Sequence, residues 1–274
     1  MTLLSFAALA AYLVASVAFV LDVWRPNERS MNVAIKALGL GAALQALDFV
    51  VGALVFSALP VTGFPRSLAL LAWTTALAGL AIIVKFRLPL VGALVAPAVS
   101  AALGLACAGS GQNHGALPEA LRSAWLPVHV TLAFLGEALF VIAAGVSFLY
   151  LIQESRLKAK RPLEIPQSRL PNLEKLDRIN YQLLTCGFVL LSLAIVSGAM
   201  WAASTWGRFW SWEPVESWSL VLWLLYAALL QSRLAVGLRG RRAARLTIAL
   251  FAVLLCSYVG INLFNPGKHG GSFG

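Results

Sequence analysis

Charged residues are scarce in this sequence. Only 12% of its 274 residues are Asp, Glu, Lys or Arg, while 60% are hydrophobic and the mean hydropathy is +0.83. A soluble globular domain carries roughly 25% charged residues, so this composition excludes one. The longest polar stretch, residues 154–180, is too short to form a sizeable soluble domain. We therefore expect an integral membrane protein.

Cysteine is also rare, and its placement excludes two kinds of chemistry. The three cysteines, Cys107, Cys186 and Cys256, lie singly in or at the ends of apolar runs. The sequence contains no C-x-x-C pair to shuttle electrons and no C-x-x-C-H motif to hold a covalent haem. A thiol-redox role is therefore disfavoured.

Apolar residues are abundant and form eight runs of about 20 residues, the length that a helix needs to cross about 30 Å of hydrocarbon. The predicted spans are Leu3–Val23, Val33–Leu59, Ser67–Phe86, Leu88–Ala108, Pro127–Gln153, Tyr181–Ala203, Trp218–Val236 and Leu246–Phe264. We interpret the first run as a retained helix, because it lacks the basic leader and the cleavage site of a signal peptide. The predicted fold is an all-α polytopic membrane protein with about eight transmembrane helices.

The positions of the basic residues predict the orientation. Of the 21 Lys and Arg residues, only Arg66, Arg122, Arg208 and Lys268 lie outside one alternating set of connections. Because basic residues stay on the cytoplasmic side during insertion, both termini are predicted to lie outside the cytoplasm. The net charge of +10 is spread over separate short loops, so nucleic acid is not an expected partner.

Three parts of the chain follow from these spans. Residues 1–153 form an N-terminal five-helix membrane part, and residues 154–180 form a basic cytoplasmic linker with three prolines. Residues 181–274 form a three-helix part that carries a tryptophan-rich outer loop.

That loop is the densest cluster of tryptophan in the chain. Four of the nine tryptophans fall between residues 206 and 218: Trp206, Trp210, Trp212 and Trp218. A membrane-interface belt needs only one or two aromatic residues at each helix end. Four tryptophans in one connection therefore favour a platform for a large flat ligand.

Histidine is scarce, and all three histidines are predicted to face the same compartment as the loop. They are His114, His129 and His269. Neutral imidazole is a common metal ligand and a usual axial ligand of haem iron. His129 and His269, which flank the tryptophans in sequence, could hold a planar tetrapyrrole from two sides. Alternatively, each imidazole lies in the headgroup region and is hydrogen-bonded to water.

Two blocks of the sequence resemble a known family. Trp206–Arg233, followed by Gly240–Ala244 and Gly260–His269, resembles the tryptophan-rich signature and C-terminal end of the CcsA/ResC cytochrome c assembly proteins, which handle haem in system II. Leu126–Val130, leading to Leu135–Phe140, resembles that family's histidine-bearing helix. The first four predicted helices match only as generic apolar segments.

The resemblance implies a site and a reaction. The tryptophan-rich, WWD-type loop would bind b-type haem transiently on the outer face, with His129 and His269 as axial ligands. Haem would be held with its vinyl groups accessible until the two thiols of an apocytochrome c C-x-x-C-H motif add across them. The chain would be a subunit of a cytochrome c synthase (haem lyase), with no catalytic residue singled out.

The same resemblance implies partners and a location. A CcsB/ResB-like membrane protein would supply the large extracytoplasmic domain that this sequence lacks, and thiol-reducing proteins would act indirectly. The membrane would be a bacterial inner membrane or a plastid thylakoid membrane, of which the bacterial one is favoured.

Two departures from the family pattern stand out. The usual Trp-Asp-Pro-Lys-Glu-Thr-Trp reads Trp-Glu-Pro-Val-Glu-Ser-Trp over residues 212–218, which keeps both acids and loses a cation. Gln231 occupies the place of a usual histidine, so the resemblance does not imply transfer of haem across the membrane through this chain. A haem-binding regulator or stabiliser of tetrapyrrole biosynthesis, similar to HemX-type proteins, is therefore a rival hypothesis. A transporter of another small molecule is a third.

A few charged residues carry further predictions. Haem propionates need cations when they leave water, and Arg208 and Lys268 are predicted to meet them. Alternatively, both are solvated rim charges. Glu213 and Glu216 are expected to cap the helix that follows them. Asp48 and Glu137 fall inside apolar spans and count as functional candidates, although we expect Glu137 to bond another helix.

Overall fold

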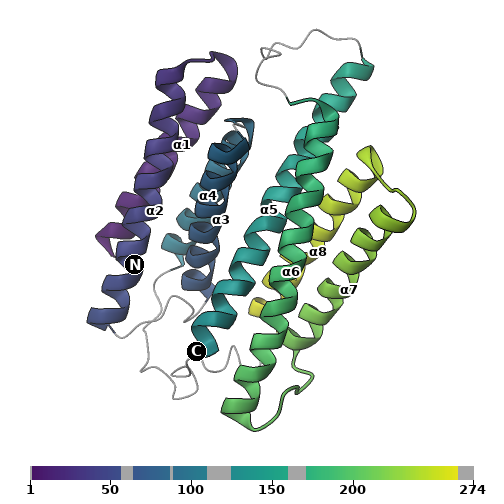
Figure 1. Ribbon diagram of the computed structural model, residues 1–274. Coiled ribbons are helices and arrows are strands. Elements are labelled where there is room, and N and C mark those ends of the chain that lie inside the picture. The colour runs from purple at the N-terminus through teal and green to yellow at the C-terminus, as the bar shows by residue number, and fades with distance from the viewer. Residues whose placement is uncertain (1, 57–63, 87–88, 110–124, 160–170, 265–274) are drawn as a thin grey trace. The chain divides into compact units, whose positions relative to one another are not determined.

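The computed structural model describes residues 2–56, 64–86, 89–109, 125–159 and 171–264, and these ranges contain α-helices and no strands (Figure 1). The eight helices are α1 (Leu3–Trp24), α2 (Glu28–Phe56), α3 (Phe64–Phe86), α4 (Pro89–Ala108), α5 (Trp125–Lys158), α6 (Leu173–Trp206), α7 (Pro214–Ala235) and α8 (Gly240–Phe264). The predicted all-α class is therefore confirmed. Among the described residues, α1 to α7 are each long and apolar enough to cross a membrane. The eighth predicted span, Leu246–Phe264, lies within α8.

Helices α5 and α6 are longer than the apolar runs that predicted them. Each has 34 residues, so both ends of the predicted linker are helical. Polar contacts explain the extensions. Lys158 Nζ lies 2.7 Å from Glu154 Oε1 one turn away, and the side chain of Asn172 accepts a hydrogen bond of 2.8 Å from Lys175 N at the start of α6. Such pairs and caps stabilise helix ends outside the hydrocarbon region.

The chain divides into two compact units. The first unit comprises residues 1–114 and 151–176, and the second comprises residues 115–150 and 177–274. In the first unit, α1 packs against α2 and α4, and α3 packs against α2 and α4.

Polar side chains join the helices of the first unit. Tyr12 Oη donates to Gln45 Oε1 at 2.8 Å, and Gln45 Nε2 donates to the carbonyl of Ala69 at 2.7 Å. Asp48 accepts hydrogen bonds from Thr2 and Ser5 at the beginning of the chain. Because a buried polar group must be hydrogen-bonded, these contacts account for polar residues inside apolar spans. Asp48 thus has a structural role in joining α1 to α2.

The second unit packs α5, α6 and α7 closely together. A Cβ atom added to Gly136 of α5 would lie 3.2 Å from the carbonyl oxygen of Gly187 in α6, so the two backbones meet without side chains between them. Phe140 of α5 stacks on Tyr226 of α7, with ring centroids 3.7 Å apart. Trp223 of α7 donates a 2.8 Å hydrogen bond to Ser192 of α6. Helix α8 packs against α7.

The second unit has two ends that differ in character. We call one the tryptophan end: it contains the first turns of α5, the last turns of α6, the connection 207–213 and the first turn of α7. The other, the arginine end, contains residues 143–150 of α5, the start of the unit's part of α6, the last turns of α7 and the first turns of α8. Each end is built from segments that are distant in sequence.

Candidate functional site

His129 lies in the first turns of α5, and its imidazole is held against α6. Its Nδ1 atom is 2.9 Å from the carbonyl oxygen of Ala194, and a Cβ atom on Gly198 would lie 2.8 Å from its Cε1 atom. A carbonyl oxygen can only accept, so Nδ1 carries the proton of the neutral ring and the lone pair is on Nε2. Metal-ligating histidines commonly have their ring orientation fixed by such a bond.

An aromatic series extends from this imidazole along α6. The ring of Trp201 stacks on that of His129, with centroids 6.2 Å apart and an interplanar angle of 16°. Trp206 contacts Trp201 edge to face at 4.9 Å. Ala194, Gly198 and Trp201 follow a helical spacing that places them on one face of α6. The structure thus joins predicted residues His129 and Trp206 through Trp201.

The connection after α6 has a defined backbone. Gly207 adopts a φ of +72° and ends the helix, with its N–H bonded to the carbonyl of Ala203 at 3.0 Å. A positive φ of this kind is the usual helix C-terminal conformation of glycine. Trp212 also has a positive φ, +57°, which is unfavourable for a residue with a Cβ atom. Pro214 then opens α7 at the first helical position.

The carboxylate of Glu216 binds this connection. Its Oε2 atom accepts from Ser211 N at 2.7 Å and from Glu213 N at 3.4 Å, and its Oε1 atom lies 3.1 Å from Ser211 Oγ. The predicted capping role of Glu216 is therefore observed. Its shortest contact, however, is with the loop rather than with the helix that it caps.

Several aromatic side chains of the tryptophan end are exposed. Trp212 is 71% exposed, Phe209 is 67% exposed and Trp218 is 42% exposed. The rings of Trp210 and Trp212 meet at 82° with centroids 5.9 Å apart. Arg208 is exposed beside them. Exposed rings of this size, clustered on the loop and at the start of α7, form an apolar surface suited to a flat ligand.

Lys268 and His269, which are predicted to contact haem, lie outside the described residues. His114, for which no ligand role is predicted, also lies outside them. In the described parts of the chain, no group of three or more His, Cys, Asp or Glu side chains could hold a metal ion.

Glu137 lies two turns after His129 on α5. Its Oε2 atom is covered and makes no hydrogen bond to the described residues, and the same holds for the hydroxyl of Tyr226. Glu137 is predicted to bond another helix, and its Oε2 atom makes no such bond within the described parts of the chain.

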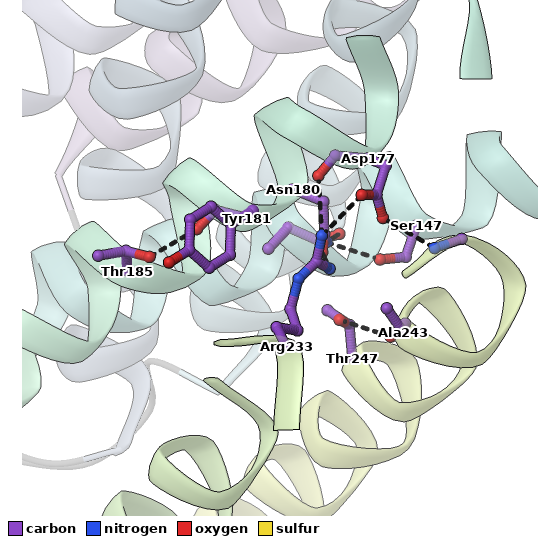
Figure 2. Close-up of polar contacts among 10 residues, drawn as sticks. Ser147, Asp177, Asn180, Tyr181, Thr185, Arg233, Ala243 and Thr247 are labelled. Atoms are coloured by element: carbon purple, nitrogen blue, oxygen red, sulfur yellow. Dashed lines mark hydrogen bonds and ion pairs between the residues drawn. The ribbon is translucent and has the colours of Figure 1, made fainter. Parts of the chain in front are cut away.

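The arginine end contains a closed polar network (Figure 2). Arg233 of α7 donates to Asn180 Oδ1 at 3.0 Å and to Asp177 Oδ2 at 2.8 Å, and its guanidinium lies 5.2 Å from the ring centroid of Tyr181. Asn180 Nδ2 donates to Ser147 and to the carbonyl of Ala143 on α5. Asp177 Oδ1 accepts from the N–H of the first residue of α8 at 3.1 Å.

This network was not predicted. The sequence places Arg233 among basic loop residues, yet the structure buries it with 6% exposure. Gln231, two residues earlier, is exposed on α7. The network joins α5, α6, α7 and α8 through hydrogen bonds, so its role is to stabilise the packing of these helices at the arginine end.

Comparison with known proteins identifies relatives over most of the chain. Residues 61–269 match the family described as Cytochrome C assembly protein. The chain is 32% identical over 238 residues to the cytochrome c biogenesis protein CcsA of Parasynechococcus marenigrum (strain WH8102), covering 77% of this chain and 76% of the relative. It is 34% identical over 242 residues to CcsA of Prochlorococcus marinus (strain NATL1A), covering 77% and 75%.

The fold is similar to that of a solved structure. The chain is similar to the cytochrome c haem lyase CcmF with a TM-score of 0.68 and 18% sequence identity. The likeness covers 99% of this chain and 47% of that one, so this chain spans about half the length of CcmF. The fold, the seven membrane-length helices of the described residues and the relatives agree: this chain is an integral membrane protein that belongs to the cytochrome c assembly protein family.

Proposed function

We propose that this protein binds b-type haem transiently at the tryptophan end and presents it for covalent attachment to an apocytochrome c. The observation that carries the proposal is the state of His129. Its Nδ1 atom is hydrogen-bonded to the carbonyl of Ala194 at 2.9 Å, which leaves the lone pair on Nε2. In this tautomer Nε2 is the nitrogen that would bind the haem iron.

The surroundings of His129 fit a planar macrocycle. Trp201 stacks on the imidazole, and Trp212 and Trp218 present exposed rings in the same unit. When bound, haem would supply the vinyl groups to which the thiols of an apocytochrome add. The chain's own residues would bind the macrocycle, orient it and shield one side from water.

Other roles come from the family resemblance. We propose His269 as the second axial ligand, and Arg208 and Lys268 as the cations that meet the propionates. Arg208 is exposed and lies in the loop between α6 and α7, as this role requires. A CcsB/ResB-like membrane protein would act as the partner that receives the apocytochrome.

The proposal includes an orientation. The tryptophan end would lie outside the cytoplasm of a bacterial cell, as would both chain termini, and the arginine end would lie inside. This assignment is supported by the concentration of basic residues in one alternating set of connections and at the helix ends beside them, including Arg239 between α7 and α8 and Arg241 and Arg242 in the first turn of α8.

An absorption spectrum tests haem binding directly. We expect the detergent-purified protein to show a low-spin, bis-imidazole haem spectrum in oxidised and dithionite-reduced forms. The His129→Ala and His269→Ala variants should each lose it, while His114→Ala, a matched control that removes the third histidine, should retain it. Absence of haem from the parent, even after coexpression with a CcsB-like partner and addition of haem, would refute the proposal.

A second measurement distinguishes delivery from regulation. Together with its partner, the protein should convert a reporter apocytochrome c into its covalent haem form. If haem binds but no reporter is matured under conditions in which a related synthase succeeds, the HemX-like regulator becomes the better hypothesis.

A further inference from the structure

We propose that Glu216 is a positioning residue: its carboxylate holds the backbone around Trp212 so that the loop presents its aromatic rings to the ligand. This inference rests on the proposed function, because the ligand is the haem of that site. Glu216 itself is assigned no contact with haem.

Glu216 binds the loop on both sides of Trp212. The N–H groups of Ser211 and Glu213 converge on the single oxygen Oε2, at 2.7 and 3.4 Å, while Ser211 Oγ lies 3.1 Å from Oε1. Backbone N–H groups that converge in this way form a concave site for an anion. Here the anion is the chain's own carboxylate, and hydrogen bonds to a charged acceptor are stronger than neutral ones.

The backbone at Trp212 needs such support. Its φ of +57° brings the Cβ atom close to the backbone. Residues other than glycine and asparagine rarely adopt this conformation. The indole is 71% exposed, so burial of the ring cannot hold this conformation. Glu216 holds the neighbours of Trp212, Ser211 and Glu213. In addition, the carbonyl of Trp212 accepts a 3.3 Å hydrogen bond from Ser217 Oγ. Both supports come from the first turn of α7.

A simple helix cap would not explain this geometry. A capping glutamate in the first turn bonds the N–H of the residue that precedes the helix, here Glu213. That bond is the longest of the three, and the two shorter ones go to Ser211, which lies outside the helix. The loop, rather than α7, is therefore the main object that Glu216 holds.

Proteolysis measures the order of the loop without haem. Arg208 is exposed and adjacent to Phe209, so trypsin can cleave the loop when it opens locally. We expect Glu216→Gln to accelerate cleavage after Arg208 by about tenfold, relative to cleavage after the exposed Arg239, because the negative charge is lost and an amide nitrogen, which cannot accept, replaces one carboxylate oxygen. Glu174→Gln is the matched control, since it removes an exposed acid from the first turn of α6.

Haem titration connects the loop to the ligand. Glu216→Gln should raise the Kd for haem by about tenfold, equivalent to about 1.4 kcal/mol. At saturating haem its low-spin spectrum should match that of the parent, since the contacts of His129 are untouched. Glu174→Gln should leave both the cleavage rate and the Kd unchanged.

The possible results separate the two claims. Unchanged cleavage in Glu216→Gln would overturn the positioning role, and so would faster cleavage with an unchanged Kd. A low-spin spectrum lost at saturation would also contradict it, because Glu216 would then act on the axial ligands. If the parent binds no haem, the proposed function fails, and with it the claim that the loop is held for haem.

Discussion

The two ends of the second unit use polar residues in opposite ways. At the arginine end, Arg233 is 6% exposed and its guanidinium is bonded to side chains and backbone of α6. At the tryptophan end, Glu216 is bonded to a loop whose most exposed aromatic side chain, Trp212, is 71% exposed. The first network joins α7 to α6, whose bonded residues are more than 50 positions apart in the sequence. The second joins the first turn of α7 to the loop that precedes it.

The comparison shows what each network stabilises. At the arginine end the polar groups are hydrogen-bonded to one another, so they contribute to the stability of the bundle. The tryptophan end holds large apolar rings outside the protein interior, an arrangement that contributes little to the stability of the bundle and is typical of a binding surface. Substitutions at the two ends should therefore affect different measurements.

The largest change in stability is expected from Arg233→Met. It leaves the carboxylate of Asp177 in a poorly hydrated position without its cation, which should cost about 3 kcal/mol. Thermal unfolding in detergent, followed by circular dichroism, would show a lowered Tm. The exposed Arg239→Met in the neighbouring turn is the control and should unfold like the parent. Equal Tm values for the two variants would contradict the claim that the network stabilises the packing of the helices at this end.

A smaller change in stability, but a clear effect on haem, is expected from Gly198→Ala. The added Cβ atom would lie 2.8 Å from Cε1 and 2.9 Å from Nδ1 of His129, so the imidazole must move. Overpacking of this kind costs about 1–3 kcal/mol. Haem titration should show a weaker Kd and an altered spectrum. Gly260→Ala is the control, because a Cβ atom there meets nothing within 4 Å. Parent-like haem binding by Gly198→Ala would argue against His129 as a ligand.

The smallest change in stability is expected from Trp212→Gly. Glycine adopts a positive φ without strain, and the lost indole is mostly exposed, so unfolding should differ by less than about 0.5 kcal/mol. Haem affinity should nevertheless fall, because a ring of the platform is gone. Paired melting and titration experiments would reveal this separation. A strongly destabilised variant would mean that Trp212 supports the fold rather than the ligand.

The helices could be predicted from the sequence because their cause is local. A run of about 20 apolar residues can satisfy its backbone in hydrocarbon only as a helix, so each run predicts a span wherever the rest of the chain lies. Predicted spans such as Leu3–Val23 agree with the observed helices within a few residues, whereas α5 and α6 continue into polar sequence. Those extensions depend on side-chain pairs and caps that hydropathy does not detect.

The candidate site was predicted only in part. The tryptophans and His129 stand out because such residues are rare or clustered, and Glu216 stands out as a first-turn acid. Trp201 and Ser211 were missed, although Trp201 lies at the end of the apolar run Tyr181–Ala203, just before the signature tryptophans. Nothing in the sequence pairs His129 with Ala194, which is 65 residues away.

By itself, the sequence determined that this chain is a helical membrane protein with an aromatic loop between its sixth and seventh helices, since length, hydropathy and composition act within each segment. Only the tertiary structure decided which imidazole nitrogen carries the proton, why residue 198 has no side chain and that Arg233 is buried. These features arise where separate helices meet, and the physical reason is that a hydrogen bond or a steric contact depends on the positions of both partners.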